Sequence, residues 1–169
     1  TDTHHLRPSD ITVNFARNNR WFDNCITPYV DEGQETGCFT SVSSWVWQPR
    51  AEVKGDVARM IFYMATRYEG ENGEPDLQVI DYLPTDDYTK DPIHAKLSTL
   101  LEWHLEDTVS VFEQNRNEVI YGYQKNRNPF IDHPEYVNKI WGTDPDVSIG
   151  LLALANFSIY PNPVHDLLT

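Results

Sequence analysis

The sequence predicts an α+β fold with a mainly helical core. Apolar residues recur at i, i+3, i+4 and i+7 over residues 52–68, which is the spacing of one buried helix face. Residues 22–50 lack that periodicity, and short pieces such as 39–42 and 45–47 suggest extended chain joined by a long loop. With 169 residues, 40% apolar and 12% aromatic, the chain is long enough for one hydrophobic core and unlike a disordered composition.

The opening stretch brings many polar side chains close together in the sequence. Ser9 or Asp10 can accept hydrogen bonds from the free N–H groups at the start of a helix, which predicts a short helix through Asn14. The adjacent His4 and His5 fit either a structural turn or a functional site, and their spacing alone leaves both interpretations open.

The helix over 52–68 is expected to bury one apolar stripe and to carry charges elsewhere. Arg59 lies close to that stripe, so we expect it either to form an ion pair or to face a ligand. The stripe consists of Val57, Met60, Ile61, Met64 and Ala65.

Further elements follow along the chain. Residues 77–80 predict a strand, and helices are expected from Pro92 to His104, from Val109 to Lys125 and from His133 to Trp141. Asp107 or Thr108 is the expected N-cap of the helix that starts at Val109. The side chains that this helix would bury are Phe112, Val119, Ile120 and Tyr123.

The net charge of −13, from 26 acidic and 13 basic residues, argues against a large basic docking face for nucleic acid. Several of the basic residues are nevertheless clustered, as in Arg7, Arg17 and Arg20, which is compatible with a local basic groove. No apolar run approaches the roughly 20 residues that span a bilayer, so no membrane span is predicted.

Cys25 and Cys38 are the only two cysteines. A disulfide between them would close the intervening loop and stabilise the fold by roughly 3 kcal/mol. Free thiols are equally compatible with the count, and the sequence alone does not decide between the two states.

Several motifs together resemble the bacterial endonuclease I family. The most specific is Asn-Arg-Asn-Pro-Phe-Ile-Asp-His-Pro at residues 126–134, and further matching stretches lie at 2–17, 54–64, 101–104 and 116–124, in family order. The resemblance implies a secreted, metal-dependent, non-specific endonuclease of DNA, and also of RNA, with the His-Me finger (ββα-metal) fold. We expect this nuclease domain over residues 1–142, incomplete at its N-terminus.

The resemblance also assigns roles at the site. In that family a histidine on a strand activates water, and an asparagine on the following helix completes the metal coordination. Asn14 matches this asparagine, which implies that it binds Mg²⁺, or alternatively Mn²⁺ or Ca²⁺. The general base is absent from this chain, so we expect the chain alone to be inactive; His4 and His5 match the segment after that histidine and, with Arg59, are expected to support the site.

A phosphate-contacting rim is expected from arginine and asparagine side chains, because guanidinium groups bind phosphate bidentately and amides donate hydrogen bonds without charge repulsion. The candidates are Arg17, Asn19, Arg116, Asn117, Asn126, Arg127 and Asn128. Alternatively, the Asn-Arg-Asn run is a helix C-cap and Arg127 pairs with Asp132. DNA and RNA are the expected partners of a monomeric chain.

The end of the chain differs in composition from the rest. Residues 143–155 are rich in Gly, Pro, Asp and small apolar residues, which predicts a linker. Residues 157–164 resemble the start of the C-terminal sorting domain read by the type IX secretion machinery of Bacteroidetes, so we expect that domain to begin at residue 156 and to fill 156–169. The resemblance implies export and favours the Cys25–Cys38 disulfide.

Other functions remain as alternatives. One is a non-catalytic extracellular module that kept the helical scaffold and binds nucleic acid, and another is an adhesin-like domain, suggested by the acidic composition and the sorting tail. A catalytic histidine strand upstream of Thr1 in the complete gene would favour the enzyme. Failure to bind DNA in excess Mg²⁺ would favour the adhesin.

Overall fold

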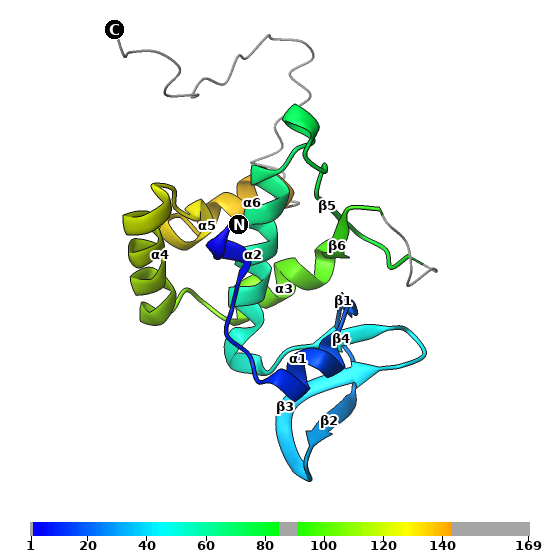
Figure 1. Ribbon diagram of the computed structural model, residues 1–169. Helices are drawn as coiled ribbons and strands as arrows, with labels where there is room; N and C mark the ends of the chain where they lie inside the picture. The colour runs from blue at the N-terminus through cyan, green and yellow to red at the C-terminus, as the bar shows by residue number, and fades with distance from the viewer. Residues whose placement is uncertain (1, 85–90, 143–169) are drawn as a thin grey trace, which may run out of the picture.

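The computed structural model describes residues 2–84 and 91–142 (Figure 1). Helix α2 (Lys54–Arg67) lies at the centre, with one part of a six-stranded sheet toward its N-terminal end, the rest beside the helix, and further helices around it. The α+β prediction with a mainly helical core is confirmed, whereas the finger fold itself stays a prediction. The predicted linker and sorting domain, 143–169, lie outside the described residues.

The sheet has the strand order β2-β3-β4-β1-β6-β5. β3 pairs antiparallel with both β2 and β4, and the other neighbours run parallel. The strands are β1 (Trp21–Phe22), β2 (Thr27–Asp31), β3 (Gln34–Ser41), β4 (Val46–Gln48), β5 (Gln78–Ile80) and β6 (Ile93–Lys96).

The extended pieces predicted at 39–42 and 45–47 overlap β3 and β4, but the long loop predicted around them is wrong, because most of residues 22–50 is sheet. The β2–β3 hairpin turns at Glu32 and Gly33, which both have positive φ, 47° and 80°. Polar residues such as Gln34 and Glu35 fill the start of β3, so the sequence shows no apolar alternation there. The strand predicted at 77–80 is confirmed as β5.

The helices agree with their local sequence signals, except that Ile93–Lys96, predicted as the start of a helix, form strand β6. The remaining ones are α1 (Ile11–Arg17), α3 (Leu97–Glu106), α4 (Val111–Gln124), α5 (Pro129–Asp132) and α6 (Glu135–Trp141), with 3-10 helices η1 (Thr3–His5), η2 (Ala51–Val53) and η3 (Glu71–Gly73). Asp10 caps α1 as expected, by accepting from the N–H groups of Thr12 and Val13. α4 starts later than predicted, after a reciprocal capping box between Ser110 and Glu113.

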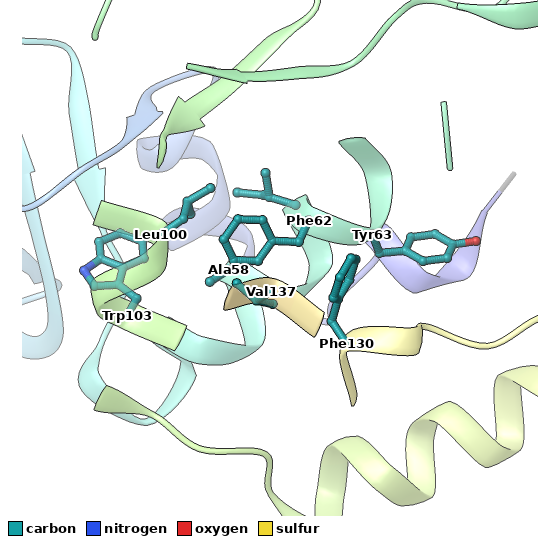
Figure 2. Close-up of a cluster of buried hydrophobic side chains, with 8 residues drawn as sticks. Ala58, Phe62, Tyr63, Leu100, Trp103, Phe130 and Val137 are labelled. Carbon is teal, nitrogen blue, oxygen red and sulfur yellow. The ribbon is translucent and has the colours of Figure 1, made fainter. Parts of the chain in front are cut away.

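The hydrophobic core surrounds α2 (Figure 2). Its buried members are Ala58, Ile61, Phe62, Tyr63, Leu100, Trp103, Phe130 and Val137. The stripe expected on α2 is thus shifted around the helix, since Ala58 and Phe62 are fully buried while Met60 and Met64 are half-buried. None of the helices in the described ranges is long and apolar enough to cross a membrane.

The prediction for the face of α4 is wrong for three of its four residues. Phe112, Val119 and Tyr123 are exposed, Tyr123 by 86%, and Ile120 alone of the four is buried. The inward face of α4 instead carries polar groups, because it meets a charged side chain of α2.

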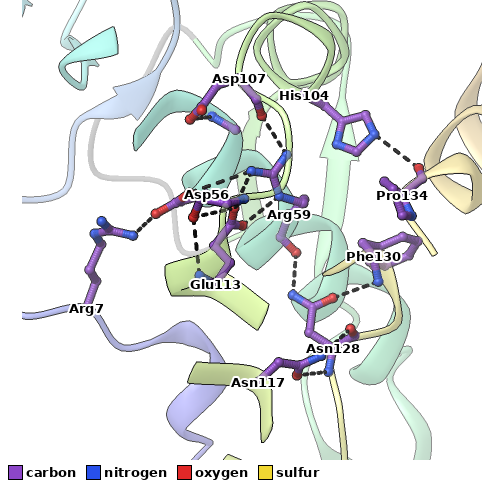
Figure 3. A network of polar contacts seen from close by, with 12 residues as sticks. Arg7, Asp56, Arg59, His104, Asp107, Glu113, Asn117, Asn128, Phe130 and Pro134 are labelled. Atoms are coloured by element: carbon purple, nitrogen blue, oxygen red, sulfur yellow. Dashed lines mark hydrogen bonds and ion pairs between the residues drawn. The ribbon is translucent and has the colours of Figure 1, made fainter. Parts of the chain in front are cut away.

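That charged side chain is Arg59, which is completely buried and paired (Figure 3). Its Nε and Nη2 donate to the two carboxylate oxygens of Glu113 at 2.7 and 2.8 Å, and its Nη1 donates to the carbonyl of Asp107 at 2.7 Å. Asp56 lies 3.6 Å from the same guanidinium and also pairs with Arg7. The expectation that Arg59 is either paired or facing a ligand is resolved in favour of pairing, and this pair joins α2 to α4.

Candidate nucleic-acid site

A cavity of about 630 Å³ opens between α1, the sheet and α2. The side chains of Asn14 and Arg17 line it from α1, and His5 lines it from the opening stretch. Its remaining wall is both apolar and basic, with Arg7, Phe22, Trp47, Arg50 and Ile61 among its members. The structure therefore brings Asn14, Arg17 and His5 to one place.

Helix α1 is oriented by contacts at its first turn. The Asp10 side chain caps the helix, and the Thr12 hydroxyl donates to Asp31 at the end of β2. This attachment turns Asp10, Val13, Asn14 and Arg17 toward the cavity, as their i, i+3, i+4 and i+7 spacing requires. Asn14 is also exposed to solvent, so its amide is accessible to a ligand.

Arg17 is the unusual cation of this site. Its guanidinium lies 4.7 Å from the centre of the Phe22 ring, and its Nε is buried without a hydrogen-bond partner. Burial lowers the pKa of Arg17, and no carboxylate among the described residues forms an ion pair with it. A desolvated cation without a counter-charge is unfavourable unless a ligand supplies the negative charge.

Two more arginines line the cavity: Arg7, which the sequence placed in one basic cluster with Arg17, and Arg50, which it did not single out. Burial lowers the pKa of Arg7, and the nearby positive charge of Arg50 lowers it further. Arg50 is exposed, and its ion pair with Glu52 spans 3.9 Å. The two arginines come from distant parts of the chain, so sequence spacing could not bring them together. The cavity is thus locally basic within an acidic protein.

His4 and His5 have different environments despite being adjacent. His4 is buried, with its Nε2 at 3.3 Å from the carbonyl oxygen of Asn126 and its ring against Tyr63, so it holds the opening stretch in place. The His5 ring lies 5.5 Å from the ring of His94 on β6, and each has one buried nitrogen without a partner.

The electrostatics around this histidine pair favour uncharged rings. Burial lowers the pKa of His5, and the positive charge of Arg17 lowers it further. Burial, followed by the charges of His5 and Arg17, lowers the pKa of His94 to about 4. Both imidazoles are therefore neutral at neutral pH.

The predicted phosphate-contacting rim is divided by the structure. Of its seven members, Arg17 alone lines the cavity. Asn19 is exposed beside the sheet, where its Oδ1 accepts from the indole N–H of Trp45 at 3.0 Å. Arg116 donates to the carbonyls of Thr3 and Leu6 and so fastens the opening stretch to α4.

Asn117 and Asn128 are buried, and their predicted contact with phosphate is wrong. The Asn128 N–H donates to the side chain of Asn117, and the Asn117 side chain donates to the carbonyl of Asn128. Asn128 also caps α5 by accepting from the Phe130 N–H, and it donates to the carbonyl of Arg59 (Figure 3). The side-chain amides of Asn117 and Asn128 therefore hold the fold together through hydrogen bonds within the protein.

The alternative interpretation of the Asn-Arg-Asn run is confirmed for the pair of Arg127 with Asp132, whereas the C-cap of α4 is Lys125, the residue before the run. Arg127 donates to Asp132 at 2.6 and 2.9 Å and to Glu118 at 2.5 Å, and these acceptors hold its pKa above the usual range. Asn126 donates to the Tyr63 hydroxyl at 2.7 Å. The most recognisable motif of the sequence is therefore a helix-to-helix connection.

The two cysteines are free thiols, so the predicted Cys25–Cys38 disulfide is not formed. Cys25 lies before β2, where its N–H donates to the Gln48 side chain at 2.8 Å, and Cys38 is buried within β3.

The described residues do not build a complete metal site. Within residues 2–84 and 91–142, no three His, Cys, Asp or Glu side chains gather to hold an ion. The Asp10 carboxylate shares the cavity wall with Asn14 but is used as the cap of α1. Asn14 can thus offer a single amide oxygen to a metal, and further oxygens would have to come from elsewhere.

Comparison with known proteins gives consistent matches. The model of the family described as endonuclease I matches residues 1–135. The extracellular ribonuclease of Bacillus subtilis (strain 168) is 52% identical over 142 residues, which are 83% of this chain and 46% of the relative. The extracellular ribonuclease of Bacillus amyloliquefaciens is 51% identical over 142 residues with the same two shares. The chain spans about half the length of the curated relatives it matches.

Proposed function

The chain belongs to the endonuclease I family, and from that premise we propose that it is a nuclease domain that receives a phosphate of nucleic acid in the cavity beside α1. The reaction class is hydrolysis of phosphodiester bonds.

The observation that carries the proposal is the unpaired guanidinium of Arg17. Arg7, Arg59 and Arg127 each have a carboxylate partner, whereas Arg17 has none among the described residues. A phosphodiester anion supplies the missing charge and accepts the N–H groups that a guanidinium offers.

Members of this family generally use divalent metal ions. We place the amide oxygen of Asn14 among the ligands, with Mg²⁺, or alternatively Mn²⁺ or Ca²⁺, as the ion. When bound, such an ion polarises the scissile phosphate and stabilises the charge that develops on it. The exposed position of Asn14 on the same wall as Arg17 supports this role.

The chain alone is expected to bind nucleic acid without cleaving it. Among the described histidines, His5 alone lines the cavity, and its Nδ1 is buried. His4 and His104 face backbone carbonyls and are buried, so neither is placed to activate a water in the cavity. We therefore assign the general base to a residue outside the described part.

The matched relatives are named as extracellular ribonucleases, which supports RNA as a substrate beside DNA and a site of action outside the cell. Export through type IX secretion machinery stays a prediction from residues 157–164, as does the monomeric state.

The experiment measures binding of fluorescent single-stranded RNA and DNA by anisotropy, with and without Mg²⁺. Arg17→Ala should weaken binding by about tenfold or more, the equivalent of one charge-assisted hydrogen bond. The matched control is Arg127→Ala, which removes an arginine that is already paired away from the cavity. Absence of binding by the unchanged chain, or equal losses in the two variants, would contradict the proposal.

A plasmid-nicking assay tests the proposal that the chain alone does not cleave nucleic acid. The chain should leave plasmid intact in Mg²⁺, Mn²⁺ and Ca²⁺. Nicking that disappears in Asn14→Ala would show that the chain holds its own general base, and the assignment of that base elsewhere would be withdrawn.

A further inference from the structure

Two imidazole rings lie close to the guanidinium of Arg17. His5 lines the cavity, and the centre of its ring is 5.5 Å from that of His94, with the two ring planes tilted by 56°. The positive charge of Arg17 lowers the pKa of both rings, so the three groups lie in one neighbourhood. Three elements, η1, α1 and β6, each contribute one of them.

Each of the three groups has a nitrogen that is buried without a hydrogen-bond partner. These atoms are His5 Nδ1, His94 Nε2 and Arg17 Nε. The acidic residue on the cavity wall, Asp10, is used as the cap of α1. The three nitrogen-bearing groups therefore lie beside an open cavity without a negatively charged acceptor from the described residues.

Few charges act on the histidine pair. Burial is the largest cause that lowers the pKa of His5, and among the described residues Arg17 lowers it further while Asp2 raises it. For His94, burial is again the largest cause, followed by the positive charges of His5 and Arg17. An anion bound at Arg17 offsets the charge that disfavours a proton on His5, so it makes protonation of that ring more favourable.

We propose that His5 is a second phosphate-contacting residue and that it takes up a proton when a phosphate of nucleic acid binds at Arg17, with His94 as the neutral ring beside it. This inference rests on the proposed function and adds regulation by pH to the same site. The proton comes from the solvent and gives both nitrogens of His5 an N–H group. The ring then donates a charge-assisted hydrogen bond to a phosphate oxygen.

His5 takes the proton in preference to His94 for two reasons. His5 is on the cavity wall, and His94 is not among the residues that line it, so His5 is the nearer ring to the bound phosphate. The pKa of His94 is lowered to about 4, so this ring stays neutral in the pH range where His5 titrates. A neutral imidazole keeps one nitrogen as an acceptor, which suits a ring in contact with a protonated partner.

Binding and protonation favour each other, so the affinity rises as the pH falls. The rise begins where His5 in the complex starts to bind the proton, and it ends where His5 in the free chain is protonated as well. Between these two values each pH unit changes the dissociation constant by up to about tenfold. Most carboxylates stay ionised above about pH 6, because their ordinary pKa values lie near 4.

The test measures dissociation constants by anisotropy from about pH 8 to about pH 5.5, at constant ionic strength and without metal ions. The probe is a short oligothymidylate without a terminal phosphate, which does not titrate in this range. The unchanged chain should bind about tenfold more tightly at the lower pH. His5→Gln keeps an N–H donor and loses the titrating group, so its dissociation constant should change by less than about threefold.

The control variant is His133→Gln, which removes a histidine from the end of α5 that pairs with Glu135 and should keep the full pH dependence. Calorimetry of the unchanged chain in two buffers of different ionisation enthalpy counts the protons taken up on binding. It tests the proton uptake even if a variant fails to fold. We expect proton uptake by the unchanged chain and none by His5→Gln.

Each other outcome overturns the inference. If His5→Gln follows the pH curve of the unchanged chain, His5 is not the group that takes up the proton. If the unchanged chain takes up no proton, or if His5→Gln weakens binding equally at every pH, His5 shapes the cavity without titrating. In these cases a loss of affinity in Arg17→Ala still supports the proposed function; if the unchanged chain binds nothing at any pH, both fail.

Discussion

Among single residues, three in or beside the cavity have a polar atom that is buried without a hydrogen-bond partner. Arg17 Nε, His5 Nδ1 and His94 Nε2 are three such atoms, contributed by α1, the opening stretch and β6. Atoms of the same kind also lie outside the cavity, on His4, Arg20, Trp21 and His104, whereas the buried guanidinium of Arg59 is fully paired. Buried polar groups without partners usually mark a functional site or a bound ligand, since each one destabilises the folded state.

Arg17→Met should keep or raise the free energy of unfolding, because it replaces a desolvated, unpaired cation with an apolar side chain of similar length. Arg59→Met is the matched opposite case: it leaves Glu113 buried and unpaired, and should lower the free energy of unfolding by about 3–5 kcal/mol. Urea denaturation of both variants measures the difference. A loss of stability in Arg17→Met as large as in Arg59→Met would show that Arg17 is a scaffold residue.

His94 makes folding stability dependent on pH. Its folded-state pKa of about 4 lies below the ordinary value of 6.5, so the unfolded chain binds the proton more readily between these values. The folding stability that depends on a neutral His94 is fully present above pH 6.5 and is lost as the pH falls toward 4. His94→Gln should reduce this loss by on the order of 2 kcal/mol, less than the full shift implies because the ring is only partly buried.

Melting temperatures from pH 7 to 4 check this, with the exposed His133→Gln as the control. If the two variants follow the same pH curve, His94 is not a source of the acid sensitivity.

Among the secondary-structure elements, the predictable ones were those with local signals. Asp10 and the spacing that follows it identify α1, and the apolar periodicity of residues 52–68 identifies α2. The face of α4 could not be predicted, because Asn117 and Glu113 turn inward only to meet Asn128 and Arg59 across the fold. The sequence pattern of α4 shows where its apolar residues lie, but it does not show which side of the helix packs against the rest of the protein.

The substitution Asn128→Ala tests whether Asn128 stabilises the fold or binds nucleic acid. It removes the cap of α5 and the bond to the Arg59 carbonyl, so the free energy of unfolding should fall by about 2 kcal/mol. Thermal or urea unfolding measures the change, with the exposed Asn138→Ala on α6 as the control. Nucleic-acid affinity below the unfolding transition should be unchanged; a selective loss of affinity without a loss of stability would restore Asn128 to the substrate rim.

At the scale of the whole molecule, the net charge of the chain has the opposite sign to the charge that lines the cavity. The chain has a net charge of −13, yet Arg7, Arg17 and Arg50 line one cavity, so binding depends on local placement rather than on bulk charge. The sequence could predict Asn14 and Arg17 together, because they share one short helix. It could not predict that Arg50 lines the cavity or that His94 packs against His5, because both placements depend on the strand order of the sheet.

The central claim is that nucleic acid binds at the cavity beside α1. The most direct measurement is a nuclear magnetic resonance titration of the ¹⁵N-labelled chain with a short, nuclease-resistant single-stranded oligonucleotide in Mg²⁺. The account predicts that the backbone amide signals of Asn14, Phe15 and Arg17, and the side-chain signals of Asn14 and Arg17, shift in a saturable way, while the backbone amide signals of Val119 and Tyr123 on the exposed face of α4 stay in place. Saturable shifts confined to α4, with the signals of α1 unmoved, would contradict it.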